Sequence, residues 1–159
     1  MGKLQFYDRR TLKLSNVLKY TIMLSDEDLD LNIAIEQMKS YIRAKGTTQM
    51  GPLIQYTRTY FNDRNEMEIE VTIMLQCNNF LHNIGQPYSM EPIIRVTNAL
   101  YCQYIGPKSS LQFAYDKINL EAFENDIAID GCSYTIFVSN NVEDDIMVAD
   151  VFMPRLDKG

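Results

Sequence analysis

The sequence has 159 residues, of which 46% are hydrophobic and 23% charged, and its formal net charge at pH 7 is -6. This composition is close to the average of globular domains and excludes an intrinsically disordered chain. The acidic balance disfavours nucleic-acid binding by this chain alone, because phosphates would be repelled and the Lys and Arg residues form no cluster.

The sequence also lacks the patterns of several kinds of site. No window approaches the roughly 18 apolar residues of a membrane span, and no signal-peptide core is present, so we expect a cytoplasmic protein. The cysteines, Cys77, Cys102 and Cys132, are widely separated, which predicts reduced thiols. Metal-ligand spacing and glycine-rich phosphate loops are missing, so we expect no metal and no cofactor. We assign the only histidine, His82, no catalytic role.

The first part of the chain predicts a strand followed by a helix. Residues 16–24 are rich in β-branched and aromatic side chains, which is typical of a strand, and residues 25–28 predict a turn. Apolar residues then recur at helical spacing from Leu31 to Ile42. Arg43 and Gly46 follow where the helix dipole and the C-terminal cap favour them.

A β-hairpin follows this helix. Residues 53–61 predict a strand, and residues 62–65 have the composition of a turn. In residues 66–75 apolar and polar side chains alternate, which predicts a strand with one buried and one solvated face.

The second half repeats this order after a connection at residues 77–92. We expect a strand over residues 96–105, a turn at 106–108, and a helix beginning with a capping box formed by Ser109 and Gln112. Two further strands are expected over residues 132–139 and 145–153, joined by a turn at Asn140 and Asn141.

An offset of 80 residues aligns the two halves. It places Gly51 on Gly131 and Glu70 on Asp150. The predicted fold class is therefore α+β, with tandem β-α-β-β repeats related by a pseudo-two-fold axis and antiparallel sheets around a central groove. We expect one domain over residues 1–159, with repeats at 16–76 and 93–156.

In each repeat the helix is expected to cover one face of its strands. This assigns to the two cores a set of alternating strand residues: Met67, Ile69, Val71, Ile73, Met147, Ala149, Val151 and Met153. The opposite faces are expected to form a concave surface suited to a small ligand.

At this point the chain resembles the GyrI-like or effector-binding domains of DNA gyrase inhibitor proteins and multidrug-sensing transcription regulators. The resemblance covers roughly residues 16–156 and is carried by four short segments, at residues 51–56, 68–73, 104–107 and 151–154. It implies a pocket lined by aromatic side chains, usually with an acidic residue in the strand after the second helix. Thr135 stands where that acid is expected, which weakens the case for a cation pocket and for an enzyme.

Our first hypothesis is a stand-alone, non-catalytic domain that binds a small lipophilic or aromatic molecule. Since the first predicted strand begins at residue 16, we expect no helix-turn-helix before it. The expected ligand groove is lined by aromatic, acidic and hydroxyl residues: Tyr56, Glu70, Tyr104, Thr135, Phe137, Asp150 and Phe152.

Two alternatives stay open. The first is a protein-interaction module whose groove, acidic surface or strand edge binds a protein partner, such as a secreted substrate, a toxin or a gyrase-like target. The second is a small hydrolase with Glu70 or Asp150 as its base, which would need a strongly raised carboxyl pKa. Either a monomer or a homodimer is compatible with the sequence.

Overall fold

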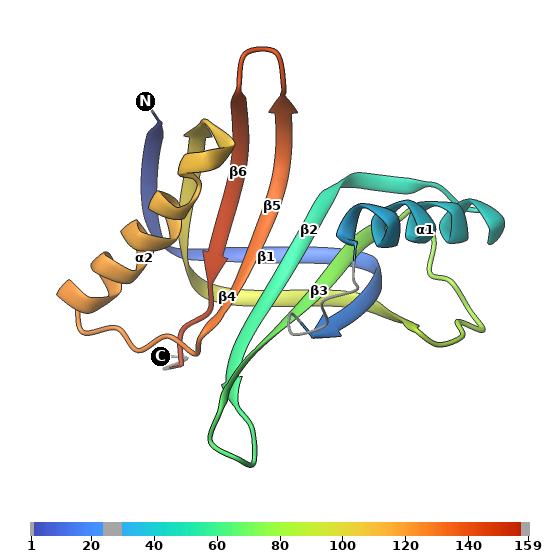
Figure 1. The fold of residues 1–159 in the computed structure, drawn as a ribbon, viewed down its shortest axis with the longest axis horizontal. Helices are drawn as coiled ribbons and strands as arrows, with labels where there is room; N and C mark the ends of the chain where they lie inside the picture. The colour runs from blue at the N-terminus through green and yellow to red at the C-terminus, as the bar shows by residue number, and fades with distance from the viewer. Residues whose placement is uncertain (1, 24–29, 157–159) are drawn as a thin grey trace. The chain divides into compact units, whose positions relative to one another are not determined.

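The computed structural model describes residues 2–23 and 30–156. Over these residues the chain forms six mostly antiparallel strands and two helices, so the α+β prediction is confirmed (Figure 1). The predicted turn at residues 25–28 lies outside the described residues. In chain order the elements are β1 (Lys3–Met23), α1 (Leu31–Ala44), β2 (Gln49–Phe61), β3 (Met67–Cys77), β4 (Tyr88–Gly106), the 3-10 turn η1 (Lys108–Ser110), α2 (Gln112–Glu124), β5 (Cys132–Asn141) and β6 (Ile146–Met153).

The chain divides into two compact units. The central unit comprises Lys13–Ile94, and the terminal unit combines Met1–Leu12 with Arg95–Gly159. The long strands β1 and β4 therefore contribute residues to both units.

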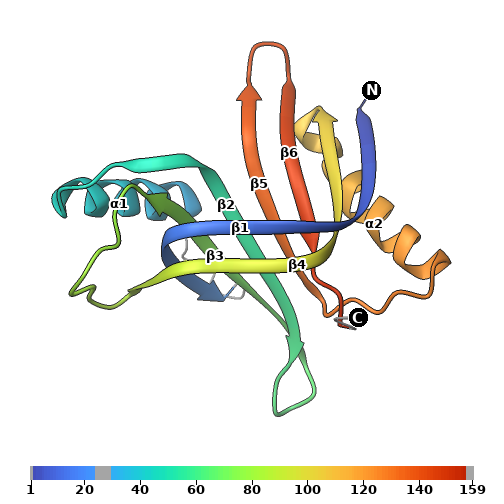
Figure 2. The same cartoon turned by 180° about the vertical axis from the view of Figure 1, so that it is seen from behind.

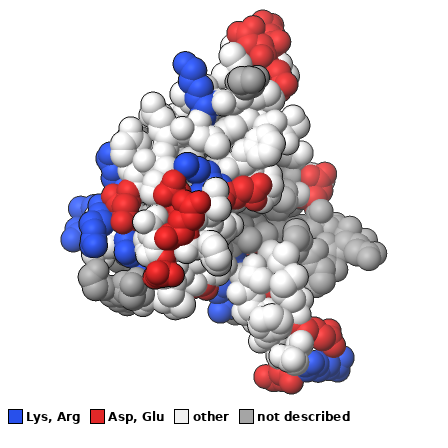
Figure 3. Space-filling model, turned by 90° about the vertical axis from the view of Figure 1, so that its left-hand side faces the viewer, with Lys and Arg blue, Asp and Glu red and all other residues white. Residues whose placement is uncertain are grey.

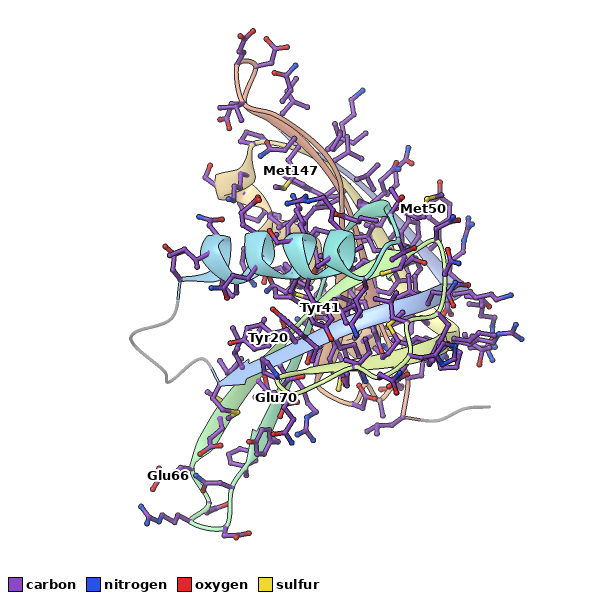
Figure 4. All side chains as sticks on the ribbon, turned by 90° about the vertical axis from the view of Figure 1, so that its right-hand side faces the viewer. Tyr20, Tyr41, Met50, Glu66, Glu70 and Met147 are labelled. Carbon is purple, nitrogen blue, oxygen red and sulfur yellow. The ribbon has the colours of Figure 1, made fainter. Side chains whose placement is uncertain are left out.

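In the central unit, α1 covers one face of a sheet in which β3 pairs with β1 and β2. Its buried core joins Met38 and Ile42 of α1 to Leu18 of β1 and to Ile73 and Leu75 of β3. Figure 4 labels two tyrosines of this region, one on β1 and one on α1, and both pack against the core.

Helix α1 forms where its spacing and caps predict it. The side chain of Asp30 accepts hydrogen bonds from the backbone N–H groups of Asn32 and Ile33, at 2.9 and 3.4 Å, which satisfies two otherwise unpaired donors. After the last turn, Gly46 adopts the left-handed conformation with a φ of 79°, as the predicted C-terminal cap requires.

The β2–β3 hairpin turns at residues 62–65, as predicted. Asn65 has a φ of 61°, and the side chain of Asn62 accepts hydrogen bonds from the backbone N–H groups of Arg64 and Glu66. The assignment of Met67 to the core is wrong: this residue is 63% exposed, because it opens β3 beside the turn and pairs with the exposed Phe61.

In the terminal unit, α2 covers one face of a sheet in which β6 pairs with β4 and β5. Ala114, Ile118 and Ala122 of α2 are buried against Leu100, Cys102, Tyr104, Val151 and Met153. The predicted capping box is wrong. Ser109 lies in η1, the N-terminal cap of α2 is Leu111, and no side chain caps the helix.

Three strands begin earlier than predicted, and β2 does so only slightly, at Gln49 rather than at residue 53. Strand β1 starts at Lys3 rather than at residue 16, and β4 starts at Tyr88, inside the predicted connection. The backbone has a positive φ at Arg9 and Asn16 in β1, and at Asn98 in β4. Such residues interrupt the alternation of side chains, so the period of two that marks a strand is broken there.

Positions 80 residues apart hold equivalent places in the two units. Ala34, Met38 and Ile42 are buried on α1, and Ala114, Ile118 and Ala122 are buried on α2. Gly51 and Gly131 have φ values of 80° and 81° at equivalent places near the start of β2 and β5. The pattern of burial and the special backbone conformation therefore repeat together.

All three cysteines are free thiols. Within the described residues, no helix is both long enough and apolar enough to cross a membrane.

Candidate ligand-binding faces

The candidate site of the terminal unit lies on the sheet face that points away from α2. Cross-strand pairing puts Phe152 opposite Tyr101, and Asp150 opposite Gln103. These residues alternate with Val151 and Cys102, which face the core under α2. Asp150 and Phe152 are therefore brought together on one face, as predicted, and Tyr101 joins them.

Three aromatic rings form a ladder on this face. The ring of Tyr101 stacks on Phe152 with centroids 4.7 Å apart, and on Tyr7 with centroids 5.9 Å apart. Phe152 is 8% exposed, whereas Tyr7 is 40% exposed, so the ladder runs from a buried ring to one open to solvent. We call Tyr7, Tyr101 and Phe152 the aromatic ladder. Figure 2 shows the N-terminal part of β1 beside β4, the two strands that carry Tyr7 and Tyr101.

A carboxylate and a guanidinium accompany the ladder. The hydroxyl of Tyr101 donates a hydrogen bond to Oδ1 of Asp150 at 2.7 Å. Burial raises the pKa of Tyr101 well above its ordinary value, and the hydrogen bond to Asp150 adds to this shift. The guanidinium of Arg10 lies 4.4 Å from the ring centre of Tyr7 and 5.8 Å from that of Tyr101. The face therefore combines stacked rings, one carboxylate and one cation held by cation–π contacts.

In the central unit, Tyr56 and Glu70 lie on the sheet face that points away from α1. Tyr56 pairs with Thr72, and Arg58 pairs with Glu70. The Arg58 guanidinium donates to Oε2 of Glu70 at 3.2 Å and lies 4.5 Å from the ring centre of Tyr60. The hydrogen bond to Glu70 is the main cause of the raised pKa of Arg58, so this carboxylate already has a cation of its own.

The next acid along β3 is held by neutral donors. Glu68 accepts hydrogen bonds from Asn62 at 2.7 Å and from Tyr60 at 2.9 Å. These two bonds lower the pKa of Glu68, with Asn62 the larger cause, and the bond to Glu68 raises the pKa of Tyr60. The polar side chains near the β2–β3 turn are thus mutually satisfied.

The expected solvated face is buried in its middle part and is accessible toward this turn. Further along the strands Val17, Ile54 and Met74 are buried on the same face, and Thr72 is 5% exposed, with its hydroxyl 2.8 Å from that of Thr21. Figure 4 shows Glu70 partway along the hairpin and Glu66 near its tip. The part of the central face near the turn is therefore polar and charged, whereas Met50, at the other end of the face, is an exposed apolar side chain.

Three predicted site residues lie on the other side of the terminal sheet. Tyr104 is fully buried in the core beneath α2, and its hydroxyl donates to the carbonyl of Pro107. A side chain at Gly106 would meet this hydroxyl at 2.8 Å, so the Gly-Pro turn here serves packing. The placement of Tyr104 on a ligand-lining face is therefore corrected.

Thr135 and Phe137 share the core side with Tyr104. Thr135 pairs with Val151, is 2% exposed and hydrogen-bonds through its hydroxyl to Tyr115 of α2. Burial raises the pKa of Tyr115. Phe137 pairs with Ala149, which lies on the same side of the sheet as Val151. The position where the resemblance implies an acid thus holds a hydroxyl that bonds the helix.

Tyr7, Arg10 and Tyr101 were not predicted as site residues from the sequence. Tyr7 and Arg10 belong to the stretch that the sequence placed before the first strand, and Tyr101 lies in the strand predicted over residues 96–105 but was not among the predicted site residues. The sequence does contain one signal for this face, at Tyr101. Successive residues of a strand face opposite sides of the sheet, so Tyr101, which directly precedes the core residue Cys102, faces away from α2. Within residues 2–23 and 30–156, no group of three or more His, Cys, Asp or Glu side chains could hold a metal ion.

No protein-family model matches the sequence, and no curated protein matches it. Among solved structures, the C-terminal domain of EcmrR is similar over 98% of this chain and 96% of that one, at 16% identity and a TM-score of 0.64. EcmrR in a complex with DNA gives the same TM-score, and there this chain spans only 57% of the EcmrR chain.

Two further structures are similar at lower scores. A hydrolase from Listeria innocua matches over 96% of this chain and 91% of its own, at 12% identity and a TM-score of 0.54. SAV2435 bound to tetraphenylphosphonium matches over 98% of this chain and 94% of its own, at 6% identity and a TM-score of 0.51. At such identities the similarity shows the fold, which this chain shares with the C-terminal domain of EcmrR.

Proposed function

We propose that this chain is a non-catalytic domain of the GyrI-like type that binds a small lipophilic or aromatic molecule. The observation that carries the proposal is the aromatic ladder of the terminal unit, where three stacked rings run from the core to the surface beside one carboxylate. Stacked rings contribute apolar area and a preferred geometry for planar groups, and a nearby carboxylate adds attraction for a positive charge.

The ligand is expected to displace Arg10 from the ladder. Arg10 is exposed, and its guanidinium already occupies the position over Tyr7 that a planar or cationic group would take. A ligand ring would stack on Tyr7 and Tyr101 in its place, with Asp150 close by. A lipophilic cation therefore fits better than an anion, and tetraphenylphosphonium, the molecule bound to SAV2435, is a suitable first probe.

The non-catalytic part of the proposal rests on how the two candidate bases are engaged. The carboxylate of Asp150 accepts the hydroxyl of Tyr101, and that of Glu70 is paired with Arg58. A general base must be able to reach a substrate proton, and an oriented nucleophile must lie beside it. Neither carboxylate has a serine, cysteine or histidine among these contacts.

Thermal shift and calorimetric titration test the proposal, with tetraphenylphosphonium and a neutral aromatic of similar size as probes. A ligand at 100 times its dissociation constant adds about 2.7 kcal/mol of stability. Arg10→Ala should tighten tetraphenylphosphonium binding, because a competing cation is removed, and Tyr7→Ser should weaken it. Lys13→Ala, which changes another exposed cation of β1, is the matched control. If neither Arg10→Ala nor Tyr7→Ser changes the affinity for tetraphenylphosphonium, the proposed site is wrong.

A further inference from the structure

Helix α2 has an apolar stripe on the side that faces solvent. Phe113 is 59% exposed, Leu120 52% and Phe123 82%. They are spaced by seven and three residues, so they lie on one side of the helix, opposite the buried Ala114, Ile118 and Ala122. We call Phe113, Leu120 and Phe123 the outer stripe. A helix with apolar residues on both sides is normally covered on both.

Helix α1 serves as an internal reference for this stripe. At the positions 80 residues earlier it carries Ile33, Ser40 and Arg43, of which only Ile33 is apolar. Since both helices bury their inner residues at matching positions, the fold does not require Leu120 or Phe123 to be apolar. The outer stripe therefore needs an explanation outside the packing of its own unit.

The surroundings of the outer stripe are acidic. Asp116, Glu124 and Asp126 are exposed around it, and Lys117 is paired with Glu121 at 2.8 Å, so its charge is already balanced. Figure 3 shows both red and blue side chains among white ones on the face that carries α2. A partner with positive charges beside its apolar residues would complement this surface.

The end of α2 is also unfavourable by itself. Helix C-termini favour cations, and α1 has Arg43 in its last turn, whereas α2 ends with Glu124 and no basic residue. Where α1 is followed by Gly46, with a φ of 79°, α2 is followed by Asp126, with a φ of 55°. Cations of a bound partner would offset the unfavourable negative charge of Glu124 and Asp126 at the C-terminal end of α2.

We infer that the outer stripe is a docking surface for a basic amphipathic helix of a partner protein. The spacing of Phe113, Leu120 and Phe123 matches the ridges with which one helix packs against another. The partner helix carries large apolar residues at intervals of three and four, with Lys or Arg beside them that face Asp116 and Glu124. A second copy of this chain is disfavoured as the occupant, since its stripe would bring the same acids into contact. This inference does not depend on the ligand proposal.

A labelled synthetic peptide provides the probe, with Leu and Lys arranged at helical spacing, and fluorescence anisotropy measures its binding to the intact chain. We expect binding that weakens as salt is added. The variant with both Leu120→Ser and Phe123→Ser keeps the net charge and should weaken binding by roughly tenfold or more. Ile33→Ser, which removes an exposed apolar side chain from α1 at the position equivalent to Phe113, is the control and should bind like the wild type. A peptide with Glu in place of Lys should not bind.

Three results would overturn the inference. One is equal affinity of the Lys peptide for the wild type and the double variant, which would show general electrostatic attraction only. Another is equal binding of the Glu peptide. The third is a wild-type dimer in sedimentation that the double variant dissolves, which would make a second copy the occupant. Circular dichroism checks the fold, and Phe123→Ser alone, at the most exposed of the three residues, replaces the double variant if that one unfolds.

Discussion

The hydrogen bond between Tyr101 and Asp150 links the carboxylate to the aromatic ladder. Tyr101→Phe removes this bond and keeps the ring. The bond is 2.7 Å long, and its acceptor is charged, so its loss should cost about 1.5 kcal/mol, the lower end for charged partners because both residues are partly exposed. For a chain of 159 residues this lowers the melting temperature by roughly 3–6 °C.

Tyr7→Phe is the matched control for this substitution. It removes a hydroxyl from the same ladder, but that hydroxyl makes only a 3.5 Å contact with the exposed Gln5. Its cost should lie within about 0.5 kcal/mol. Denaturant unfolding measures both variants, and a double-mutant cycle with Asp150→Asn isolates the coupling between Tyr101 and Asp150. If Tyr101→Phe costs no more than Tyr7→Phe, or if the cycle gives no coupling, the assigned hydrogen bond is wrong.

The pH dependence of stability gives a second test of the environment assigned to Tyr101. The folded state raises the pKa of Tyr101, chiefly through burial, so the folded chain holds this proton at pH values where the unfolded chain releases it. The contribution to stability is therefore complete below the unfolded pKa of about 10 and is lost as the pH rises above it. Unfolding experiments between neutral and alkaline pH should show this decline in the wild type and a smaller one in Tyr101→Phe.

The remaining predictions concern the positions that hold each unit together. Thr135→Val leaves the partly buried hydroxyl of Tyr115 without its partner and should destabilise the chain by about 1–3 kcal/mol, measured by denaturant unfolding. Met38→Ala opens a cavity at a fully buried site and should cost about 2–5 kcal/mol in the same assay. Gly51→Ala and Gly131→Ala should each lower the melting temperature by a similar amount, because both place a side chain at a φ near 80°; unequal losses would contradict the equivalence of the two positions.

The sequence predicts most of the local structure because its signals are strong where the chain is regular. The alternation in β3, the turn at Asn62 and the cap at Gly46 all lie where they were expected. The starts of β1 and β4 could not be predicted, since left-handed residues such as Arg9 and Asn98 break the pattern inside each strand. The breaks in β1 also concealed Tyr7, one of the three residues of the aromatic ladder.

The facing of the candidate site residues was harder to predict than their strands. Asp150 and Thr135 both fall on predicted strands, but the register between β5 and β6 decides which side of the sheet each one faces. Thr135 pairs with Val151, so it faces α2, whereas Asp150 pairs with Ile136 on the opposite face. A register shift of one residue would move each of these side chains to the opposite face. The alternation of residues within one strand does not determine its register against a neighbouring strand.

The two units share a plan and use their equivalent acids differently. Glu70 is paired directly with Arg58, so a ligand cation would have to break an ion pair to reach it. Asp150 is instead bonded to the neutral hydroxyl of Tyr101, while the nearby cation, Arg10, rests on exposed ring surface. Exposed cation–π contacts contribute only about 0.5–1 kcal/mol, so Arg10 can leave at little cost. We therefore expect a ligand cation to replace Arg10 more easily than Arg58, and for this reason the proposed site is placed in the terminal unit rather than in the central one.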